Sequence, residues 1–443
     1  MNHETAFVLT HESDPQRKSK STSLIALAIT RSLGRQGVPV VRIHPNRLDR
    51  SLASKYCSAV EVSPDFYASE EDLLNFLLSL GQRYQGKRVL IPASDDCAWF
   101  VGKHHAALSQ VFAVVAPSMA VMDVIIDKKS QYEQAQRLGI PIPETYFPAS
   151  LEEVIKLAPT LGNFPYVIKP LVAHAWRRAS MKGVSQGKKG FAVHNTQELI
   201  SRYEAIAQGD KKVMVQEVIG GSDDRLLTFL SYFNSAAQPV AYCIRKKVRQ
   251  FPVDFGYCTM TLSCHDPVVE EQSIKLLQGM GFHGISGVEW KVDPRSGVCK
   301  LIEINPRAVN TTAIAAACGV DLPYIAFRET LGQQECTVTT WRDDVKWINF
   351  EQDAWAAREL CRQGKLSWGE WRESITGRKV HALYAPDDVW PFAGYFSEFL
   401  QGRLARLWSG RGRIFRRREA TLAGDGPHPS VAQPAQASVA NPQ

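Results

Sequence analysis

The chain lacks any run that approaches the roughly 18–20 consecutive apolar residues of a membrane-spanning helix, although 44% of its 443 residues are hydrophobic. Its first residues, MNHETAFVLTHESD, also lack the basic and then apolar order of a secretory signal. We therefore expect a cytoplasmic protein. A chain of this length is sufficient for two or three domains with cores of their own.

Cysteine pairs at metal-binding or redox spacing are absent as well. The nine cysteines are scattered and include no C-x-x-C, which is typical of reduced, mostly buried thiols and not of a disulfide framework. Cys258, Cys264 and His265 lie close together in the sequence. No second ligand pair accompanies them, so a zinc site is not predicted.

The positive net charge is concentrated in one segment without acidic residues. Residues 401–418, QGRLARLWSGRGRIFRRR, hold seven arginines, which equals the whole excess of 52 basic over 45 acidic residues. The rest of the chain is neutral. The broad positive surface of a protein that binds DNA or RNA is therefore not predicted.

Residues 4–115 contain short β-branched runs, such as AFVLT, PVVRI and RVLIPAS, separated by segments with helical periodicity. This alternation predicts a parallel sheet built from βαβ units. The first connection, STSLIALAITRSLGRQG, lacks G-x-G-x-x-G, so a dinucleotide site is not predicted there. We expect an α/β domain over residues 1–120.

The remaining chain divides by pattern into three parts. Residues 121–335 mix helices and strands, which predicts an α+β region, and a lysine-rich glycine loop, MKGVSQGKKG, follows the strand FPYVIKPL. Residues 336–400 are rich in tryptophan and have a helical pattern. Residues 401–443 are predicted to form a basic segment and a disordered tail rich in Ala, Pro and Gln.

Two carboxylates are predicted to face each other in the segment GISGVEWKVDPRSGVCKLIEINPR, which has two alternating runs around the turn DPRSG. If Asp293 faces Cys299, Glu289 lies opposite Glu303, and Asn305 shares their face. Like charges directly opposite are destabilising unless a cation lies between them. Two carboxylates and an amide oxygen suit Mg²⁺ or Mn²⁺. The alternative is a solvated hairpin face that binds nothing.

Basic side chains form a second candidate cluster. On the strand PVAYCIRKKVR, Arg245, Lys247 and Arg249 project to one face, a spacing suited to a transferring phosphoryl group and a carboxylate substrate. Arg307 follows Glu303 by four residues, and its planar fork can bind phosphate or carboxylate bidentately. We predict that these four basic residues are catalytic. The alternative for the triple is an ordinary basic strand edge.

Taken in order, these features resemble the ATP-grasp superfamily. The set is Lys128, Lys169, MKGVSQGKKG, VQEVIGG, Glu289 and EINPR from Glu303 to Arg307. The resemblance covers about residues 1–335. It implies an α/β pre-ATP-grasp domain and two subdomains that hold ATP between them, a lid over about 130–212 and a metal-binding subdomain over about 213–335.

The resemblance also implies roles for individual residues. The implied ATP contacts are Lys128 and Lys169 at the phosphates, Gly183 and Gly187 in the lid loop, Gln216, Glu217 and Ile219 at the adenine, and Asp223, with Asp224 as the alternative, at the ribose. For Glu217 and Ile219 the contact is through the backbone. The implied metal ligands are Glu289, Glu303 and Asn305, the same site that the hairpin register predicts independently.

A looser resemblance connects GVDLPYIAFRETLG and GKLSWGEWRESITGRKVHALYAPDDVWPF with ATP-grasp carboxylate-amine ligases, a group that includes D-aspartate ligases. It implies an ATP-dependent ligase that joins a carboxylate to an amine through an acylphosphate, with release of ADP and phosphate. A non-catalytic nucleotide-binding regulatory or scaffold protein and a kinase-like enzyme remain alternatives. The expected partners are small-molecule substrates and not nucleic acid. Assembly into a homo-oligomer is an open alternative.

The C-terminal segment has two interpretations. From Trp390 to Trp408 apolar residues fall mostly at helical spacing, with arginines among and after them. Such a helix can lie at an anionic membrane surface, which predicts a peripheral contact with the inner face of the membrane. The other interpretation is a helix packed on the body of the protein, followed by a solvated basic tail.

Overall fold

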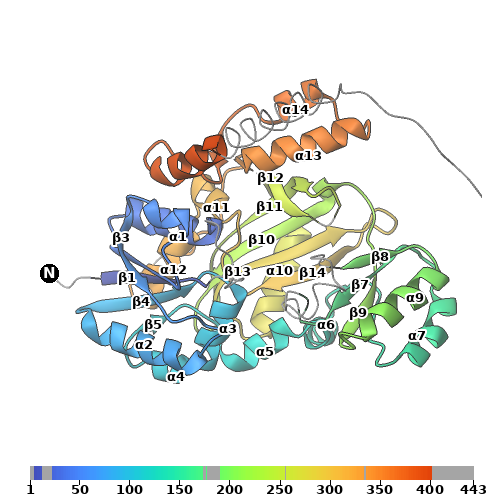
Figure 1. Ribbon diagram of the computed structural model, residues 1–443, viewed down its shortest axis with the longest axis horizontal. Helices are drawn as coiled ribbons and strands as arrows, with labels where there is room; N and C mark the ends of the chain where they lie inside the picture. Colours follow the sequence, from blue (N-terminus) through green and yellow to red (C-terminus); the bar gives the residue numbers. More distant parts are fainter. Residues whose placement is uncertain are drawn as a thin grey trace, which may run out of the picture. The chain divides into compact units, whose positions relative to one another are not determined.

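The computed structural model describes residues 4–11, 22–172, 176, 190–254, 256–333 and 336–401. These residues form three β-sheets, all within a unit that spans residues 1–392 (Figure 1). The described part of the second unit, residues 393–401, is helical. None of the described helices has the length and apolar character needed to span a bilayer.

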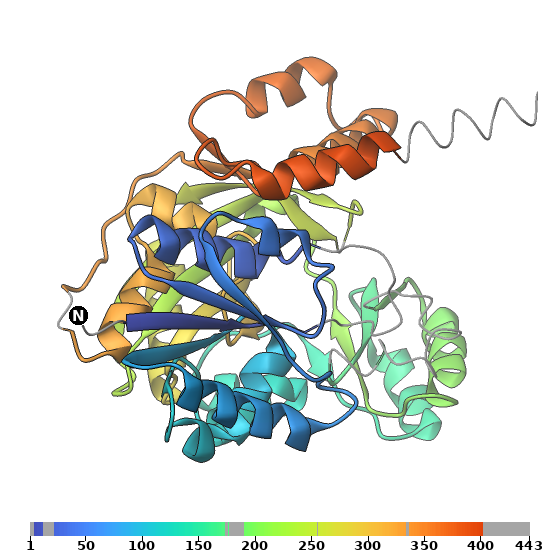
Figure 2. The same ribbon diagram turned by 60° about the vertical axis from the view of Figure 1, so that its left-hand side comes forward.

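The first sheet is wholly parallel, in the order β3-β2-β1-β4-β5. Successive residues of β1 point to opposite faces, so Ala6 and Val8 pack in the core that contains Ile29 of α1, whereas Phe7 packs in the core that contains Leu77 of α2. Figure 2 shows these strands side by side between the helices. The predicted parallel βαβ sheet is confirmed. Its elements are β1 (Glu4–Leu9), α1 (Leu24–Arg35), β2 (Val40–His44), η1 (Arg50–Ala53), β3 (Cys57–Val62), α2 (Glu70–Arg83), β4 (Lys87–Pro92), α3 (Asp95–Lys103), α4 (His105–Leu108) and β5 (Ala113–Val114).

The second sheet is small and antiparallel, in the order β6-β9-β7-β8. Val154 of α7 and Tyr203 of α9 pack with Tyr166 and Val215 of the sheet, so both helices share a core with it. This layer lies in the region that the sequence predicts to be the lid. Its elements, with the two helices that precede it, are α5 (Met119–Ile126), α6 (Lys128–Arg137), β6 (Thr145–Tyr146), α7 (Leu151–Leu157), η2 (Ala158–Thr160), β7 (Tyr166–Pro170), β8 (Phe191–Val193), α9 (Thr196–Ala207) and β9 (Val213–Glu217).

The third sheet has seven strands in the order β14-β13-β10-β11-β12-β15-β16. Its buried residues belong to the same core as Ala6 and Ile29 of the first sheet's layer, and Trp290 is the largest side chain that this core encloses completely. Its elements are η5 (Asp223–Arg225), β10 (Leu226–Phe233), β11 (Pro239–Phe251), β12 (Tyr257–Cys264), α10 (Pro267–Gly279), β13 (Gly284–Val292), β14 (Cys299–Asn305), α11 (Ala313–Cys318), α12 (Leu322–Thr330), β15 (Lys346–Ile348) and β16 (Lys379–His381).

The segment after residue 336 differs from its predicted helical pattern. It contains α13 (Phe350–Arg362) and α14 (Trp368–Ser374), but the strands β15 and β16 precede and follow them and extend the third sheet. Each of these strands has three residues, which is too short to produce a recognisable period-two pattern. Tertiary pairing of β15 with β12 and of β16 with β15, and not local sequence, determines them.

Candidate active site

The carboxylate pair lies where the hairpin register predicts it. Glu289 on β13 faces Glu303 on β14, and both side chains are partly exposed. The register beyond them is different, because a bulge inserts one residue into β14 and brings Val292, not Asp293, opposite Cys299. The bulged region is anchored through its backbone. The Tyr132 hydroxyl donates to the Ile302 carbonyl at 2.7 Å.

Lys128 approaches this pair from the N-terminus of α6. The Asp127 side chain caps the helix by accepting from the Ser130 N–H at 2.8 Å. The Lys128 Nζ lies 3.2 Å from Glu303 Oε1, and only 11% of the lysine side chain is exposed. Burial lowers the pKa of Lys128, but the Glu303 carboxylate outweighs it and the pKa is raised. Lys128 is therefore a buried, protonated cation beside the carboxylates.

Arg307 is the second cation beside them. It forms a two-point ion pair with Asp95 of α3, with distances of 2.8 Å from Nε to Oδ1 and 2.9 Å from Nη2 to Oδ2, and its Nη2 donates to Asn305 Oδ1 at 3.3 Å. Burial opposes ionisation, yet Asp95, Glu303 and Glu289 together raise the pKa of Arg307. Sequence reasoning missed Asp95. Its position directly after β4, at the carboxyl edge of a parallel sheet, is a signal that can identify it.

A row of paired residues connects the carboxylates to a buried arginine. Glu303 pairs with Glu289, Glu289 with Thr228 and Thr228 with Arg245, so all four side chains share one face of the third sheet. Arg245 is 2% exposed. Its Nη1 donates to Thr261 Oγ1 at 3.3 Å, and no carboxylate within the described ranges pairs with it.

Two polar atoms in this row have no hydrogen-bond partner among the described residues. They are Arg245 Nε and Thr228 Oγ1, and both are buried. An unpaired buried cation and an unpaired hydroxyl are costly. Their direct pairing across β10 and β11 marks a place where an anionic ligand would satisfy both groups.

The other two predicted basic residues of β11, Lys247 and Arg249, have different partners. Lys247 donates to Gln250 Oε1 at 3.3 Å and acts electrostatically on Asp223, whose pKa burial raises. Arg249 lies at an irregularity in the β11–β12 register and is bound at 2.9 and 2.8 Å by both oxygens of Asp353 on α13. The ion pair with Asp353 joins Arg249 to the C-terminal segment, and the catalytic role of Arg249 stays a prediction.

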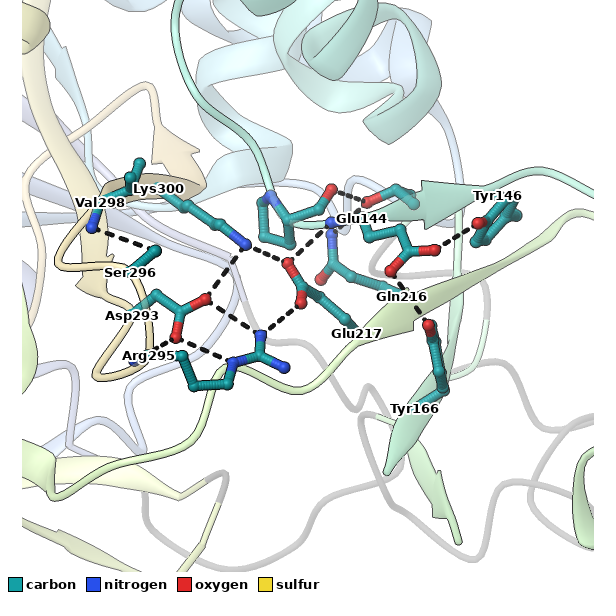
Figure 3. A network of polar contacts seen from close by, with 12 residues as sticks. Glu144, Tyr146, Tyr166, Gln216, Glu217, Asp293, Arg295, Ser296, Val298 and Lys300 are labelled. Atoms are coloured by element: carbon teal, nitrogen blue, oxygen red, sulfur yellow. Dashed lines mark hydrogen bonds and ion pairs between the residues drawn. The ribbon is translucent and has the colours of Figure 1, made fainter. Parts of the chain in front are cut away.

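The residues predicted to contact ATP meet at the end of β9. Lys169 Nζ donates to Gln216 Oε1 at 3.2 Å, and Gln216 Nε2 donates to Thr145 Oγ1 at 2.9 Å. The Glu217 N–H already donates to the Glu144 carbonyl at 2.9 Å, so this donor is not available to a base. Figure 3 shows the contacts of Glu217 with the β13–β14 turn.

The remaining predicted contacts are less defined. Ile219 is partly exposed just beyond β9, Asp223 accepts from Gln250 Nε2 at 2.7 Å, and Asp224 is exposed beside Ser222. Gly183 and Gly187 lie outside the described residues.

The donor set of the hairpin fits a hard divalent cation. Glu289, Glu303 and Asn305 offer only oxygen ligands, as Mg²⁺ and Mn²⁺ prefer. In the described part of the chain no group of three His, Cys, Asp or Glu side chains is arranged so that it could hold a metal ion. The third donor of the predicted set is an amide, and its oxygen now accepts from Arg307.

The comparison with known proteins agrees with this geometry. The sequence family described as "ATP-grasp in the biosynthetic pathway with Ter operon" matches residues 235–352, which include the carboxylate hairpin. The biotin carboxylase domain of 2-oxoglutarate carboxylase from Hydrogenobacter thermophilus, solved with MgADP and bicarbonate, has a TM-score of 0.58 at 16% identity over 78% of this chain and 73% of its own. The chain has the ATP-grasp fold.

The chain is also similar in sequence to distant relatives. The D-aspartate ligase of Enterococcus faecium (strain Aus0004) is 22% identical over 298 residues, which are 64% of this chain and 68% of the ligase. The carbamoyl phosphate synthase large chain of Thermoanaerobacter sp. (strain X514) is 26% identical over 224 residues, 46% of this chain but only 19% of that protein. The predicted fold and the resemblance to carboxylate-amine ligases are confirmed.

Proposed function

We propose that the chain is an ATP-dependent ligase that joins a carboxylate to an amine and releases ADP and phosphate. One observation carries the proposal. A single row across the third sheet places the facing carboxylates Glu289 and Glu303 two and three strands from Arg245, a buried guanidinium with no acidic partner among the described residues. A site with both features can hold a metal-bound nucleotide and an anionic substrate together.

The nucleotide end of the site is formed by lysines and carboxylates. Lys128 and Lys169 are the proposed contacts to the ATP phosphates, and they contact Glu303 and Gln216, which a phosphate can replace. Glu289, Glu303 and Asn305 would hold Mg²⁺ or Mn²⁺. When bound, the ion supplies neutralisation of the charge on the transferring phosphoryl group.

The substrate end is formed by arginines. Arg245, with the Thr228 hydroxyl beside it, is the proposed contact to the substrate carboxylate or the phosphoryl group. Arg307 is fixed in orientation by Asp95, so its cationic face stays directed toward the carboxylate hairpin. Lys247 adds positive charge along the same strand. This arrangement achieves catalysis by positioning and electrostatics, without a covalent protein intermediate.

The proposed reaction has two steps. A carboxylate oxygen attacks the γ-phosphorus of ATP, the bond to the β-phosphate oxygen breaks, and ADP leaves with an acylphosphate formed. The amine then attacks the acyl carbon, loses a proton, and displaces phosphate as the C–N bond forms. The D-aspartate ligase among the relatives supports this chemistry over a simple phosphoryl transfer.

A substrate screen tests the proposal. Amino acids and amines are supplied in pairs with Mg²⁺-ATP, ADP release is measured, and the product mass is determined. The proposal expects ADP and phosphate with an amide product. AMP and pyrophosphate would contradict the acylphosphate mechanism, a phosphorylated product would indicate a kinase, and ATP binding without turnover in any pair would favour a regulatory protein.

We also propose a cytoplasmic location and contact with an anionic membrane through the C-terminal segment. In the second unit Phe396, Phe399 and Leu400 are 47%, 37% and 43% exposed, which supports an apolar stripe that faces outward. The arginines that follow lie outside the described residues. Sedimentation with anionic vesicles, for the full chain and a version that ends before Gln401, decides between the two interpretations. Equal binding, or none by either, would exclude a role for the arginines.

Self-association is a separate proposal. The related carboxylase domain was solved as a dimer, which supports a homo-oligomer here. Light scattering of the purified chain measures its mass directly, and a monomer at all concentrations would contradict the proposal.

A further inference from the structure

Four charged side chains close a ring between the second and third sheets (Figure 3). Arg295 Nη2 lies 2.8 Å from Glu217 Oε2 and 3.0 Å from Asp293 Oδ2. Lys300 Nζ lies 3.3 Å from Asp293 Oδ2 and also contacts Glu217 Oε1. We call Glu217, Asp293, Arg295 and Lys300 the hinge ring. Each cation of the ring contacts both of its carboxylates.

The hinge ring is enclosed and charge-balanced. The side chains of Glu217 and Asp293 are 4% and 3% exposed, whereas that of Arg295 is 50% exposed. The hydrogen bonds from Arg295 hold the pKa of Asp293 well below its usual range. Burial raises the pKa of Glu217, but the contacts with Lys300 and Arg295 outweigh burial, so the pKa of Glu217 is lowered. The ring therefore stays ionised at neutral pH.

The ring connects the two ends of the proposed nucleotide site. Glu217 is the last residue of β9 and lies within the segment proposed to read the base, and its neighbour Gln216 contacts Lys169. Lys300 lies on β14, three residues before Glu303. The same strand is held at Leu301, whose N–H donates to the Pro141 carbonyl at 2.9 Å.

We propose that the hinge ring positions the base-reading end of β9 against the metal-binding hairpin, so that the Glu217 side chain determines nucleotide affinity without itself contacting ATP. This inference rests on the proposed function. Glu217 is a positioning residue, because its carboxylate is occupied by two cations of the ring. Loss of the ring frees the β9 end from β14, while Glu289, Glu303 and Lys128 keep their own contacts.

Two ligands distinguish an effect on the base end of the nucleotide site from an effect on its phosphate end. Mg²⁺-ATP requires both, whereas Mg²⁺-tripolyphosphate requires only the lysines and the metal carboxylates. Calorimetric titration of the full chain with each ligand needs no knowledge of the acid or amine substrate. For Glu217→Gln we expect an increase of about tenfold in the dissociation constant for Mg²⁺-ATP, in the range seen for supporting contacts, and none for Mg²⁺-tripolyphosphate.

Every other outcome has a definite meaning. Equal affinities of the variant and the wild type for Mg²⁺-ATP would overturn the inference while the proposed function stands. An equal loss for both ligands would also overturn it, because the ring would then act on the phosphate end or on the whole fold. Failure of the wild type to bind either ligand would contradict the proposed function itself.

Two further variants keep the test decisive. Arg295→Gln alters the half-exposed member of the ring, is expected to fold, and should weaken Mg²⁺-ATP binding in the same selective way. The matched control is Arg83→Gln, which breaks a 3.1 Å pair with Glu61 at a similar exposure of 54% on the first sheet's layer. The control should change neither affinity.

Discussion

Replacing Asp353 with alanine should destabilise the protein more than any single surface change, because this carboxylate holds the C-terminal helices on the third sheet. Asp353 is 0% exposed and accepts from Arg249 Nε and Nη2 at 2.9 and 2.8 Å, from Thr259 Oγ1 at 3.0 Å and from Trp371 Nε1 at 2.9 Å. Without it, the guanidinium of Arg249, 4% exposed, remains buried and unpaired.

The expected loss follows from that unpaired charge. Breaking a buried ion pair by removing one partner costs about 3–5 kcal/mol, whereas replacing both partners by apolar residues of similar volume is often neutral. Asp353→Ala should therefore lower the free energy of unfolding by about 3–5 kcal/mol. The double variant Arg249→Met/Asp353→Leu should recover most of this loss and should bind Mg²⁺-ATP normally, because the Arg249 guanidinium is already bound by Asp353.

Urea unfolding followed by circular dichroism measures these differences. The matched control is Glu152→Gln, which breaks a 2.7 Å pair with Lys156 in which both side chains are more than 70% exposed, and it should cost no more than about 0.5 kcal/mol. A loss below about 1 kcal/mol in Asp353→Ala, or a double variant no more stable than the single one, would refute this reasoning. Loss of Mg²⁺-ATP binding in the double variant would indicate that Arg249 contributes to the nucleotide site.

Two further predictions concern the site and the first sheet. Arg245→Gln should lower turnover by about a hundredfold or more with little change in Mg²⁺-ATP affinity, and parallel losses of both in kinetics and calorimetry would contradict its place at the substrate end. Burial lowers the pKa of His11, but the contacts of His11 with Asp96 and Cys97 outweigh burial and raise this pKa from 6.5 to about 10. The stability from the His11–Asp96 pair is therefore fully present below pH 6.5 and is lost as the pH rises through about 10. Urea unfolding should accordingly show that the difference in free energy of unfolding between the wild type and Asp96→Asn narrows between pH 6 and 10. A difference that is independent of pH would contradict a charged His11.

The sequence predicts those parts of the fold whose determinants are local. The parallel sheet follows from β-branched runs between helical segments, and the helix from Lys128 follows from a cap one residue before it. The facing of Glu289 and Glu303 follows from the period of two and the turn between the strands.

Other features depend on contacts that are distant in sequence. The bulge at β14 is supported by Tyr132, which lies 170 residues away. Arg249 donates to Asp353, which lies 104 residues away in the sequence. The periodicity of a strand carries no information about such partners, so the basic face of β11 could be predicted only in part.

The most direct test of the whole account is the metal dependence of ATP binding in the two hairpin variants Glu289→Gln and Glu303→Gln. Each change removes one charge from the facing pair and keeps the shape of the side chain. Calorimetry with and without Mg²⁺ should show ATP binding by the wild type that depends on the metal, weakened about tenfold or more in each variant, with unchanged circular dichroism. Mg²⁺-ATP affinity equal to that of the wild type in both variants would contradict the assignment of the hairpin as the metal-nucleotide site.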